Sequence, residues 1–350
     1  MKFRRAPRAQ SLLAALIVGV TLPTNLLAQG VPDPLRDAVL RSGGRVIVTL
    51  RSTVPGNFIR LPGSPPVTGT ELASIADRLG SNYQLRETSR APFAGMIMGE
   101  ISADQAAALA ADPNVERVEA DRLWSPTDLG DAVDLSDRWA AYRVRADEIP
   151  YGVTNVTAPT VWAGGNRGEG VKVAAMDSGG DASHSDLSYV GGYNAITRTA
   201  SDWADDIAPC NGHGTHVAGT IAALDNGSGV VGVAPRSQLY AIKVFENVSG
   251  SCLAYTSSQI NGLQWAVTQG IRLVNVSIGG SYSPSYDSAI QTAAGQGTYL
   301  IAAAGNSGGA VLFPASSQYA IAVAAVDGSN IRPSWSDYGP EVDFAAPGVG

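Results

Sequence analysis

The sequence predicts an α/β fold: a doubly wound, mostly parallel sheet with helices on both faces, preceded by a small α+β module. Three observations predict it. Strand-like and helix-like segments alternate through the second half of the chain. An apolar run, Val171 to Met176, ends at Asp177 in an Asp-Ser-Gly-Gly turn, typical of a buried parallel strand. The segment from about 45 to 120 follows a β-α-β-β-α-β order, as in ferredoxin-like folds.

The first 28 residues predict a secretory signal. Basic residues precede an apolar stretch from Leu12 to Leu22, and Leu-Leu-Ala at 26–28 suits cleavage. The stretch is shorter than the roughly 20 residues that span a membrane, so we expect a secreted, extracellular protein without a membrane anchor in this chain. The net charge of −7 argues against a nucleic-acid partner.

Residues 29–122 form the predicted α+β module. We expect strands at 45–50, 93–98 and 115–120, a helix from Glu71 that ends at Gly80, and a second helix opened by a capping box at Ser102. One strand of the pattern is poorly marked. Residues 123–148 are polar and weakly periodic, which predicts an exposed linker open to cleavage.

The segment from 149 to 350 supplies the predicted parallel sheet. Apolar runs predict strands at 238–244, 272–277, 298–304, 320–325 and 342–346, the last a core strand. Helical spacing predicts helices at 257–269 and 286–294.

Asp177 is the first candidate catalytic residue. In doubly wound sheets chemistry gathers at the carboxyl ends of strands. An aspartate there can accept a hydrogen bond from histidine Nδ1 and stabilise the imidazolium. The alternative is an Asx turn that only caps the strand.

His213 is the second candidate. The run from Asn211 to Thr220 reads Asn-Gly-His-Gly-Thr-His-Val-Ala-Gly-Thr, which predicts a general base at the start of a helix with a small-residue face. Little side-chain bulk surrounds the imidazole in the sequence. A structural or solvated histidine is an alternative, and so is a metal ligand paired with His216. Gly214 stands where H-E-x-x-H motifs have glutamate, which argues against zinc.

These motifs, in the order Asp then His, resemble those of the subtilisin-like serine proteases, from about Ile149 to the end of the chain. Further matching blocks are Gly-Val-Ala-Pro at 232–235, Asn-Val-Ser-Ile-Gly-Gly at 275–280, Ala-Ala-Gly-Asn at 303–306 and Ala-Ala-Pro-Gly at 345–348. The resemblance implies an endopeptidase acting on polypeptides, with Asp177 and His213 as triad members and Asn306 as side-chain donor of the oxyanion hole.

The resemblance also implies two substrate-binding walls. Ser277, Ile278 and Gly279 would pair with an extended peptide, and Ala303, Ala304 and Gly305 would line the opposite side of the first pocket. Leu312 would close the bottom of that pocket and favour smaller apolar side chains.

One part of the family pattern is missing. The Gly-Thr-Ser-Met-Ala nucleophile motif does not occur before Gly350. We therefore expect that the catalytic domain is incomplete at its C-terminus and that the serine follows Gly350. The alternative is a non-catalytic, peptide-binding pseudoprotease.

By the same resemblance, residues 29–122 are an inhibitor-type propeptide that would bind its own protease domain, and 123–148 would hold the maturation site. An unrelated adhesion domain is the alternative. We expect a monomer.

The resemblance further implies a structural Ca²⁺ and no catalytic metal. The loop with Leu224, Asn226, Ser228 and Val230 would bind the ion with Asp186, and Asp147 would replace the usual N-terminal ligand. An ordinary Asn-Gly turn is the alternative.

Cys210 and Cys252 are the only cysteines, and export favours their pairing as a disulfide. Two buried thiols are the alternative.

Overall fold

The computed structural model describes residues 33–51, 69–127, 148–210 and 212–349. The predicted signal peptide at 1–28, the proposed calcium ligand Asp147 and most of the expected linker lie outside these ranges. The described residues from Pro34 onward belong to one compact unit, so contacts between the N-terminal module and the larger sheet can be described.

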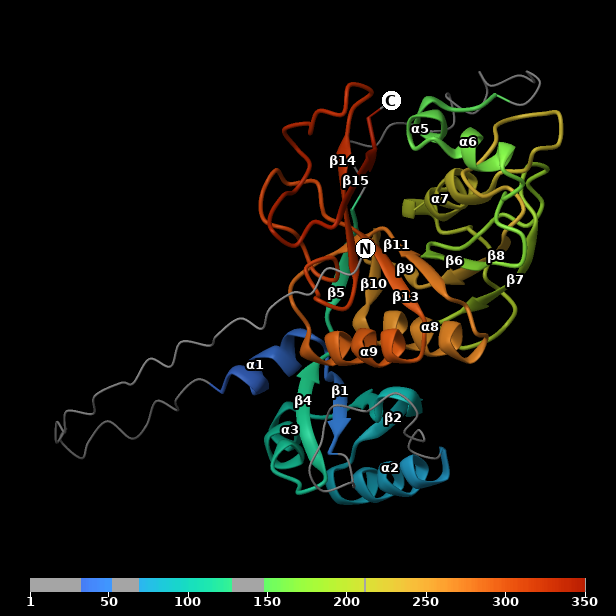
Figure 1. The fold of residues 1–350 in the computed structure, drawn as a ribbon. Helices are drawn as coiled ribbons and strands as arrows, with labels where there is room; N and C mark the ends of the chain where they lie inside the picture. The colour runs from blue at the N-terminus through green and yellow to red at the C-terminus, as the bar shows by residue number, and fades with distance from the viewer. Residues whose placement is uncertain (1–32, 52–68, 128–147, 211, 350) are drawn as a thin grey trace, which may run out of the picture. The chain divides into compact units, whose positions relative to one another are not determined.

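A seven-stranded sheet is the centre of the larger part (Figure 1). Its order is β15-β14-β13-β11-β6-β8-β7, and every adjacent pair is parallel. The strands are β6 Lys172–Asp177, β7 Tyr189–Asn194, β8 Gln238–Lys243, β11 Leu273–Val276, β13 Tyr299–Ala303, β14 Ile321–Val326 and β15 Phe344–Pro347. The predicted parallel α/β sheet is therefore confirmed.

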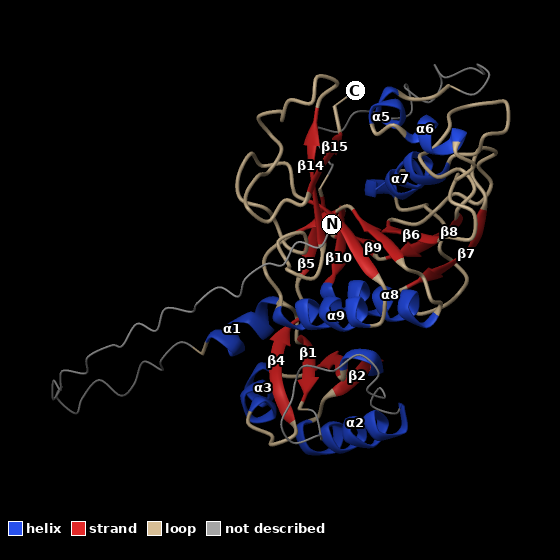
Figure 2. Cartoon of the chain, viewed as in Figure 1, coloured by secondary structure: helices blue, strands red, loops and turns tan. Residues whose placement is uncertain are grey.

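Helices cover both faces of this sheet (Figure 2). Alternate residues of β6 show why: Ala174 and Met176 pack in one buried cluster with helices α8 (Thr256–Thr268) and α9 (Pro284–Gly295). Val173 and Ala175 pack in another cluster with helix α7 (His213–Ala222). Both faces of a parallel strand are thus buried, which accounts for its continuous apolar run.

The C-terminal strand differs from expectation. The sequence predicts a core strand at 342–346, but β15 is the edge of the sheet, and Phe344 is 63% exposed. An edge strand has one neighbour instead of two, and no described residue pairs with its outer side.

The N-terminal module has a four-stranded antiparallel sheet in the order β2-β3-β1-β4. Its elements are α1 Pro34–Arg41, β1 Arg45–Leu50, α2 Gly69–Tyr83, β2 Arg86–Ala91, η1 Pro92–Ala94, β3 Met96–Glu100, α3 Ala103–Ala110 and β4 Val115–Ala120. Ser102 caps α3 by accepting from the Gln105 amide, as the capping box predicts.

Four details of the module differ from the sequence expectation. The strand expected at 93–98 begins only at Met96, after the short helix η1. Helix α1 is not predicted by the sequence pattern. The poorly marked strand is β2, a polar edge strand of sequence Arg-Glu-Thr-Ser-Arg-Ala. Helix α2 continues past Gly80 to Tyr83, and a Cβ on Gly80 would lie 3.2 Å from the Leu85 carbonyl oxygen, so this glycine allows a close approach instead of ending the helix.

A second four-stranded sheet joins the beginning of the expected linker to the larger part. Its order is β12-β5-β10-β9, with β5 Leu123–Pro126, β9 Phe245–Val248, β10 Ser251–Tyr255 and β12 Ile278–Gly279. Residues 123–126 are therefore a paired strand and not exposed linker, because two strand edges of the larger part accept it.

Three short helices complete the described fold: α5 Tyr151–Asn155, α6 Ala158–Ala163 and η2 Ala208–Cys210. None of the helices in the described ranges has the length and apolar character needed to cross a membrane.

Candidate active site

Asp177 is the last residue of β6 and is completely buried. The apolar run that forms the central strand carries this carboxylate to the carboxyl end of the sheet. One oxygen, Oδ1, accepts from the Ser178 amide at 2.7 Å. That contact alone would fit a turn cap, but the same oxygen has a second partner.

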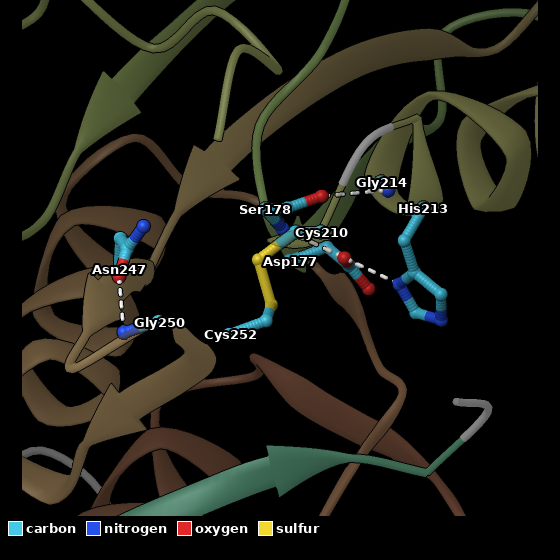
Figure 3. The surroundings of a disulfide bond; sticks show 8 residues. All are labelled: Asp177, Ser178, Cys210, His213, Gly214, Asn247, Gly250 and Cys252. Atoms are coloured by element: carbon cyan, nitrogen blue, oxygen red, sulfur yellow. Dashed lines mark hydrogen bonds and ion pairs between the residues drawn. A yellow bond between two sulfur atoms is a disulfide. The ribbon is translucent and has the colours of Figure 1, made fainter. Parts of the chain in front are cut away.

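His213 is that partner, and its Nδ1 lies 2.6 Å from Asp177 Oδ1 (Figure 3). The histidine is the first residue of α7 and is only 9% exposed, so the imidazole is more buried than the sequence suggests. A carboxylate on Nδ1 fixes the tautomer in which Nε2 acts as the base. The pair has the geometry of a general base and its orienting group.

Gly214 brings the helix and the strand end together. Its amide donates to Ser178 Oγ at 2.9 Å, and a Cβ on this glycine would lie 2.4 Å from the Gly179 carbonyl oxygen. The glycine after the histidine therefore permits close backbone contact, in addition to adding no bulk beside the imidazole.

The charges around the pair are mainly negative. Burial raises the pKa of the Tyr189 phenol, and the carboxylates of Asp205, Asp181 and Asp177 raise it further. Lys243 lies in the neighbouring strand β8, at the register position opposite Asp177. Its side chain is buried and donates to the Ala204 carbonyl and to Asp206. This lysine balances part of the acidic surroundings.

Asn306 follows β13, and its side-chain Nδ2 donates to the backbone carbonyl of Thr127. Asp337 secures this loop: its Oδ1 accepts from the amides of Ser307 and Gly309, each at 2.8 Å. The amide predicted to be an oxyanion donor is thus held against a peptide carbonyl of the chain itself.

The segment around that carbonyl is paired on both sides. On one side the Thr127 amide donates to the Ser277 carbonyl at 3.0 Å, and β12 pairs Ile278 with Pro126 and Gly279 with Ser125. On the other side β10 pairs Ala254 with Trp124 and Tyr255 with Leu123. The predicted edge at Ser277, Ile278 and Gly279 therefore binds an extended strand.

Leu312 lies next to the opposite wall, because its amide donates to the Ala304 carbonyl. A Cβ on Gly279 would lie 2.7 Å from Leu312 Cδ1 and 3.0 Å from Thr127 Cγ2. A Cβ on Gly305 would lie 2.9 Å from Leu312 Cδ1. The leucine thus fills the space between Gly279 and Gly305, and Ala303 and Ala304 precede Gly305 in the second wall.

Sequence reasoning missed three parts of the site: β5, Asp337, and Thr256, whose hydroxyl accepts from the Trp124 indole of β5 at 2.7 Å. The first had a weak signal: the apolar pair Leu-Trp at 123–124 begins an otherwise polar stretch. Nothing local marks Thr256 or Asp337, since their partners lie far away in the sequence.

A disulfide joins Cys210 to Cys252, with the Cα atoms 5.3 Å apart (Figure 3). This confirms the predicted pair. Cys210 ends η2, three positions before His213, and Cys252 lies within β10. The bond therefore ties the histidine-bearing segment to the strand that borders β5.

The proposed calcium loop brings most of its predicted ligands together. Asp186 is buried, and its carboxylate accepts from Asn226 Nδ2 at 3.1 Å and from the Val230 amide at 3.0 Å. The Leu224 amide donates to the Asp186 carbonyl, and Asn226 Oδ1 accepts from the amide of Ser228. The last contact also fits an ordinary Asx turn. Among the described residues, no three His, Cys, Asp or Glu side chains are grouped for a metal.

Known proteins share this sequence pattern. Residues 168–350 match the model of the subtilase family. An alkaline protease of Alkalihalobacillus alcalophilus is 42% identical over 224 residues, 63% of this chain and 57% of the relative. M-protease of Shouchella clausii (strain KSM-K16) is 39% identical over 252 residues, 71% of this chain and 59% of the relative. Subtilisin DY of Bacillus licheniformis is 43% identical over 210 residues, 58% of this chain and 74% of the relative. The chain thus spans 57% and 59% of the length of the first two relatives.

Proposed function

The chain belongs to the subtilase family, and on that premise we propose that it acts as a secreted serine endopeptidase on polypeptide substrates. One observation carries the proposal. A peptide segment of the chain is bound as an extended strand, and the Asn306 amide donates to the carbonyl of its last described residue, Thr127. The cleft therefore has the contacts needed to hold a peptide and to polarise one of its carbonyl groups.

The proposed chemistry is acyl transfer. A serine expected after Gly350 attacks the substrate carbonyl, and His213 accepts its proton and then delivers that proton to the leaving amine. Asp177 keeps the imidazole in the required tautomer and stabilises its protonated form. Asn306 donates to the oxyanion, and such a donor is worth about 3–4 kcal/mol in the transition state, a magnitude established on the oxyanion-hole asparagine of subtilisin.

We also propose that residues 29–122 are a propeptide that inhibits the protease domain. Two buried carboxylates of the module support this. Glu119 accepts from the Ser285 amide at the start of α9, and Asp121 accepts from the Ser257 amide at the start of α8. Carboxylates at helix N-termini are stabilised by the unpaired amides and the helix dipole. Ile47, Met96 and Met98 of the module are buried in one cluster with α8 and α9 residues.

The proposed maturation site is the bond after Thr127, within the linker assigned from the sequence. Its carbonyl is the one that Asn306 contacts, whereas Trp124 and Pro126 are buried in the cleft strand. A hydrolysed bond must present its carbonyl to the oxyanion donor. The small Thr127 side chain beside Leu312 agrees with a first pocket that favours smaller residues.

A structural calcium ion is the remaining proposal. The oxygens of Asp186 and Asn226 and the carbonyls of Leu224, Ser228 and Val230 are the hard donors that Ca²⁺ prefers. The proposal is supported by the contacts that Asn226 and Val230 make with the Asp186 carboxylate through their N–H groups. Asp147 would add a second carboxylate; the neighbouring Glu148 amide donates to the Gly229 carbonyl.

The test of the main proposal has two steps. The reading frame after codon 350 should encode Gly-Thr-Ser-x-Ala, and the full-length protein should react with a serine-directed phosphonate probe at that serine. A frame that stops there, or another residue at that position, would instead support the non-catalytic peptide-binding alternative. A His213→Ala variant is the matched control, because it should lose labelling while keeping the serine.

A further inference from the structure

Helix α7 begins at His213 without a side-chain cap of its own. The residue before it is Gly212, with a φ of 77° and no side chain that could accept from the first-turn amides. Such amides need acceptors from elsewhere. Ser178 supplies one through its hydroxyl oxygen (Figure 3). Asp205 supplies another, because its Oδ2 accepts from the Thr215 amide at 2.9 Å. The turn that carries the candidate base is therefore held from outside the helix.

Asp205 holds this turn by two hydrogen bonds to one residue. Its Oδ2 also accepts from Thr215 Oγ1, at 2.7 Å. Since the hydroxyl of Thr215 gives its proton to the carboxylate, its oxygen remains an acceptor, and the Asp181 amide donates to it at 3.1 Å. Asp181 follows Asp177 by four positions. A chain of hydrogen bonds thus connects the first turn of α7 to the turn after β6.

The loop that carries Asp205 is fastened to the same turn. The Gly180 amide donates to the Trp203 carbonyl at 3.1 Å. A Cβ on Gly179 would lie 2.6 Å from that carbonyl oxygen, so the loop and the turn are in close backbone contact. The carboxylate of Asp205 therefore has a fixed position relative to Asp177, and through its hydrogen bonds it gives the first turn of α7 a fixed position as well.

We propose that Asp205 is a positioning residue, which holds the first turn of α7 through Thr215 so that His213 Nδ1 meets the Asp177 carboxylate. The inference rests on the proposed endopeptidase function. His213 and Thr215 lie two positions apart in one helical turn, so a shift of the Thr215 amide would carry the imidazole with it. A general base must lie within hydrogen-bond reach of its partners, and a displacement of about 1 Å can cost about 100-fold in rate.

The first test measures kcat and KM of full-length variants on a peptide substrate, with kcat referred to the folded fraction from circular dichroism. Asp205→Ala removes the acceptor and should lower kcat by about 10- to 100-fold, with KM within about twofold of wild type. Asp205→Asn keeps an oxygen that can accept both hydrogen bonds, so it should retain most of the wild-type kcat. Asp202→Asn is the matched control at an exposed aspartate of the same loop, and it should leave kcat and KM unchanged.

The second test does not depend on activity. The proton on His213 Nδ1, in its hydrogen bond to Asp177, should give a separate low-field signal in the proton NMR spectrum, and its loss in His213→Ala would identify it. We expect this signal in the wild-type protein and in Asp205→Asn, and a weakened or absent signal in Asp205→Ala. Should the wild-type protein hydrolyse no peptide, the proposed function would fail, and the NMR signal alone would decide the role of Asp205.

A wild-type kcat in Asp205→Ala would overturn the proposal. So would an equal loss of kcat in Asp205→Ala and Asp205→Asn, because the acceptor that only the second variant keeps would then not explain the loss. A lowered kcat with an unchanged His213 signal would overturn it too, since the imidazole would have kept its place.

Discussion

His213 Nδ1 lies 2.6 Å from Asp177 Oδ1, and this contact joins the first turn of α7 to the carboxyl end of β6 across 36 positions of the chain. The carboxylate is fully buried and also accepts from the Ser178 amide. Strand β6 positions Asp177, and helix α7 positions His213. The hydrogen bond between them therefore depends on how closely α7 approaches the turn after β6.

Replacing His213 with alanine should lower kcat by roughly 10⁴- to 10⁶-fold with little change in KM, because the base acts in the transition state. Steady-state kinetics of the full-length protein on an unfolded polypeptide would measure this. His216→Ala is the control, since this exposed histidine lies on the same helix three positions later. Equal kcat values for wild type and His213→Ala would show that the base is misassigned.

Gly214→Ala should destabilise the protein by about 1–3 kcal/mol, since the new methyl group would overlap the Gly179 carbonyl and push α7 away. Gly219→Ala in the same helix meets no atom within 4 Å and should stabilise by about 0.5–1 kcal/mol. Chemical denaturation of both variants would measure the difference. Equal effects of the two substitutions would contradict the close-approach argument.

The isolated module, residues 29–127, should inhibit the matured protease when added in trans at micromolar concentration or below. Glu119→Gln should weaken inhibition about tenfold or more, because the Ser285 amide would lose a charged acceptor. Glu100→Gln is the control within the module, since Glu100 pairs with Arg86 of the neighbouring strand β2. An inhibition constant that Glu119→Gln leaves unaltered would argue against this contact, and absence of any inhibition would argue against the propeptide assignment.

Chelation of calcium should lower the melting temperature of the wild-type protein, by an amount that grows with the free calcium present before chelation. Asp186→Asn should lose this calcium-dependent increment, because it removes the described carboxylate of the loop. Asp225→Asn should retain it, since Asp225 pairs with Arg167. If the chelator did not change the melting temperature, the calcium site would be refuted and the loop would be an ordinary Asx turn.

The Lys243–Asp206 contact should make stability depend on pH at the acid end. The hydrogen bond from Lys243, and then its charge, lowers the pKa of the Asp206 carboxyl below its usual value. A lowered folded-state pKa contributes stability above about pH 4, and that contribution is lost as the pH falls through the lower folded value. Asp206→Asn should thus melt below wild type at pH 6, with a gap that narrows toward pH 3.

The gap is expected to be small, because the Asp206 side chain is 64% exposed and solvent screens the pair. Thermal melts of both proteins between pH 3 and pH 7 would show it. The control is Asp202→Asn, at an exposed aspartate nearby that forms no ion pair with the described residues. A gap that stays constant with pH would contradict the assignment.

The sequence by itself determined the parallel sheet, the strand that carries Asp177, the helix that begins at His213 and the pairing of the two cysteines. Local sequence patterns predict these features: an apolar run, a small-residue helix face, a family motif, and a single possible cysteine pair. Side-chain periodicity over a few residues reports burial directly, so such elements can be predicted without knowing their neighbours.

Only the tertiary structure decided which segments meet. Trp124 donates to Thr256 across 132 positions of the chain, and Asn306 reaches Thr127 across 179. In isolation, Leu123–Thr127 resembles a linker; it becomes a strand because β10 and β12 offer it two edges. Likewise only the structure shows that the strand with Phe344 is the edge of the sheet and that this side chain is exposed. Strand pairing depends on partners that are distant in sequence, and the local residue pattern does not identify those partners.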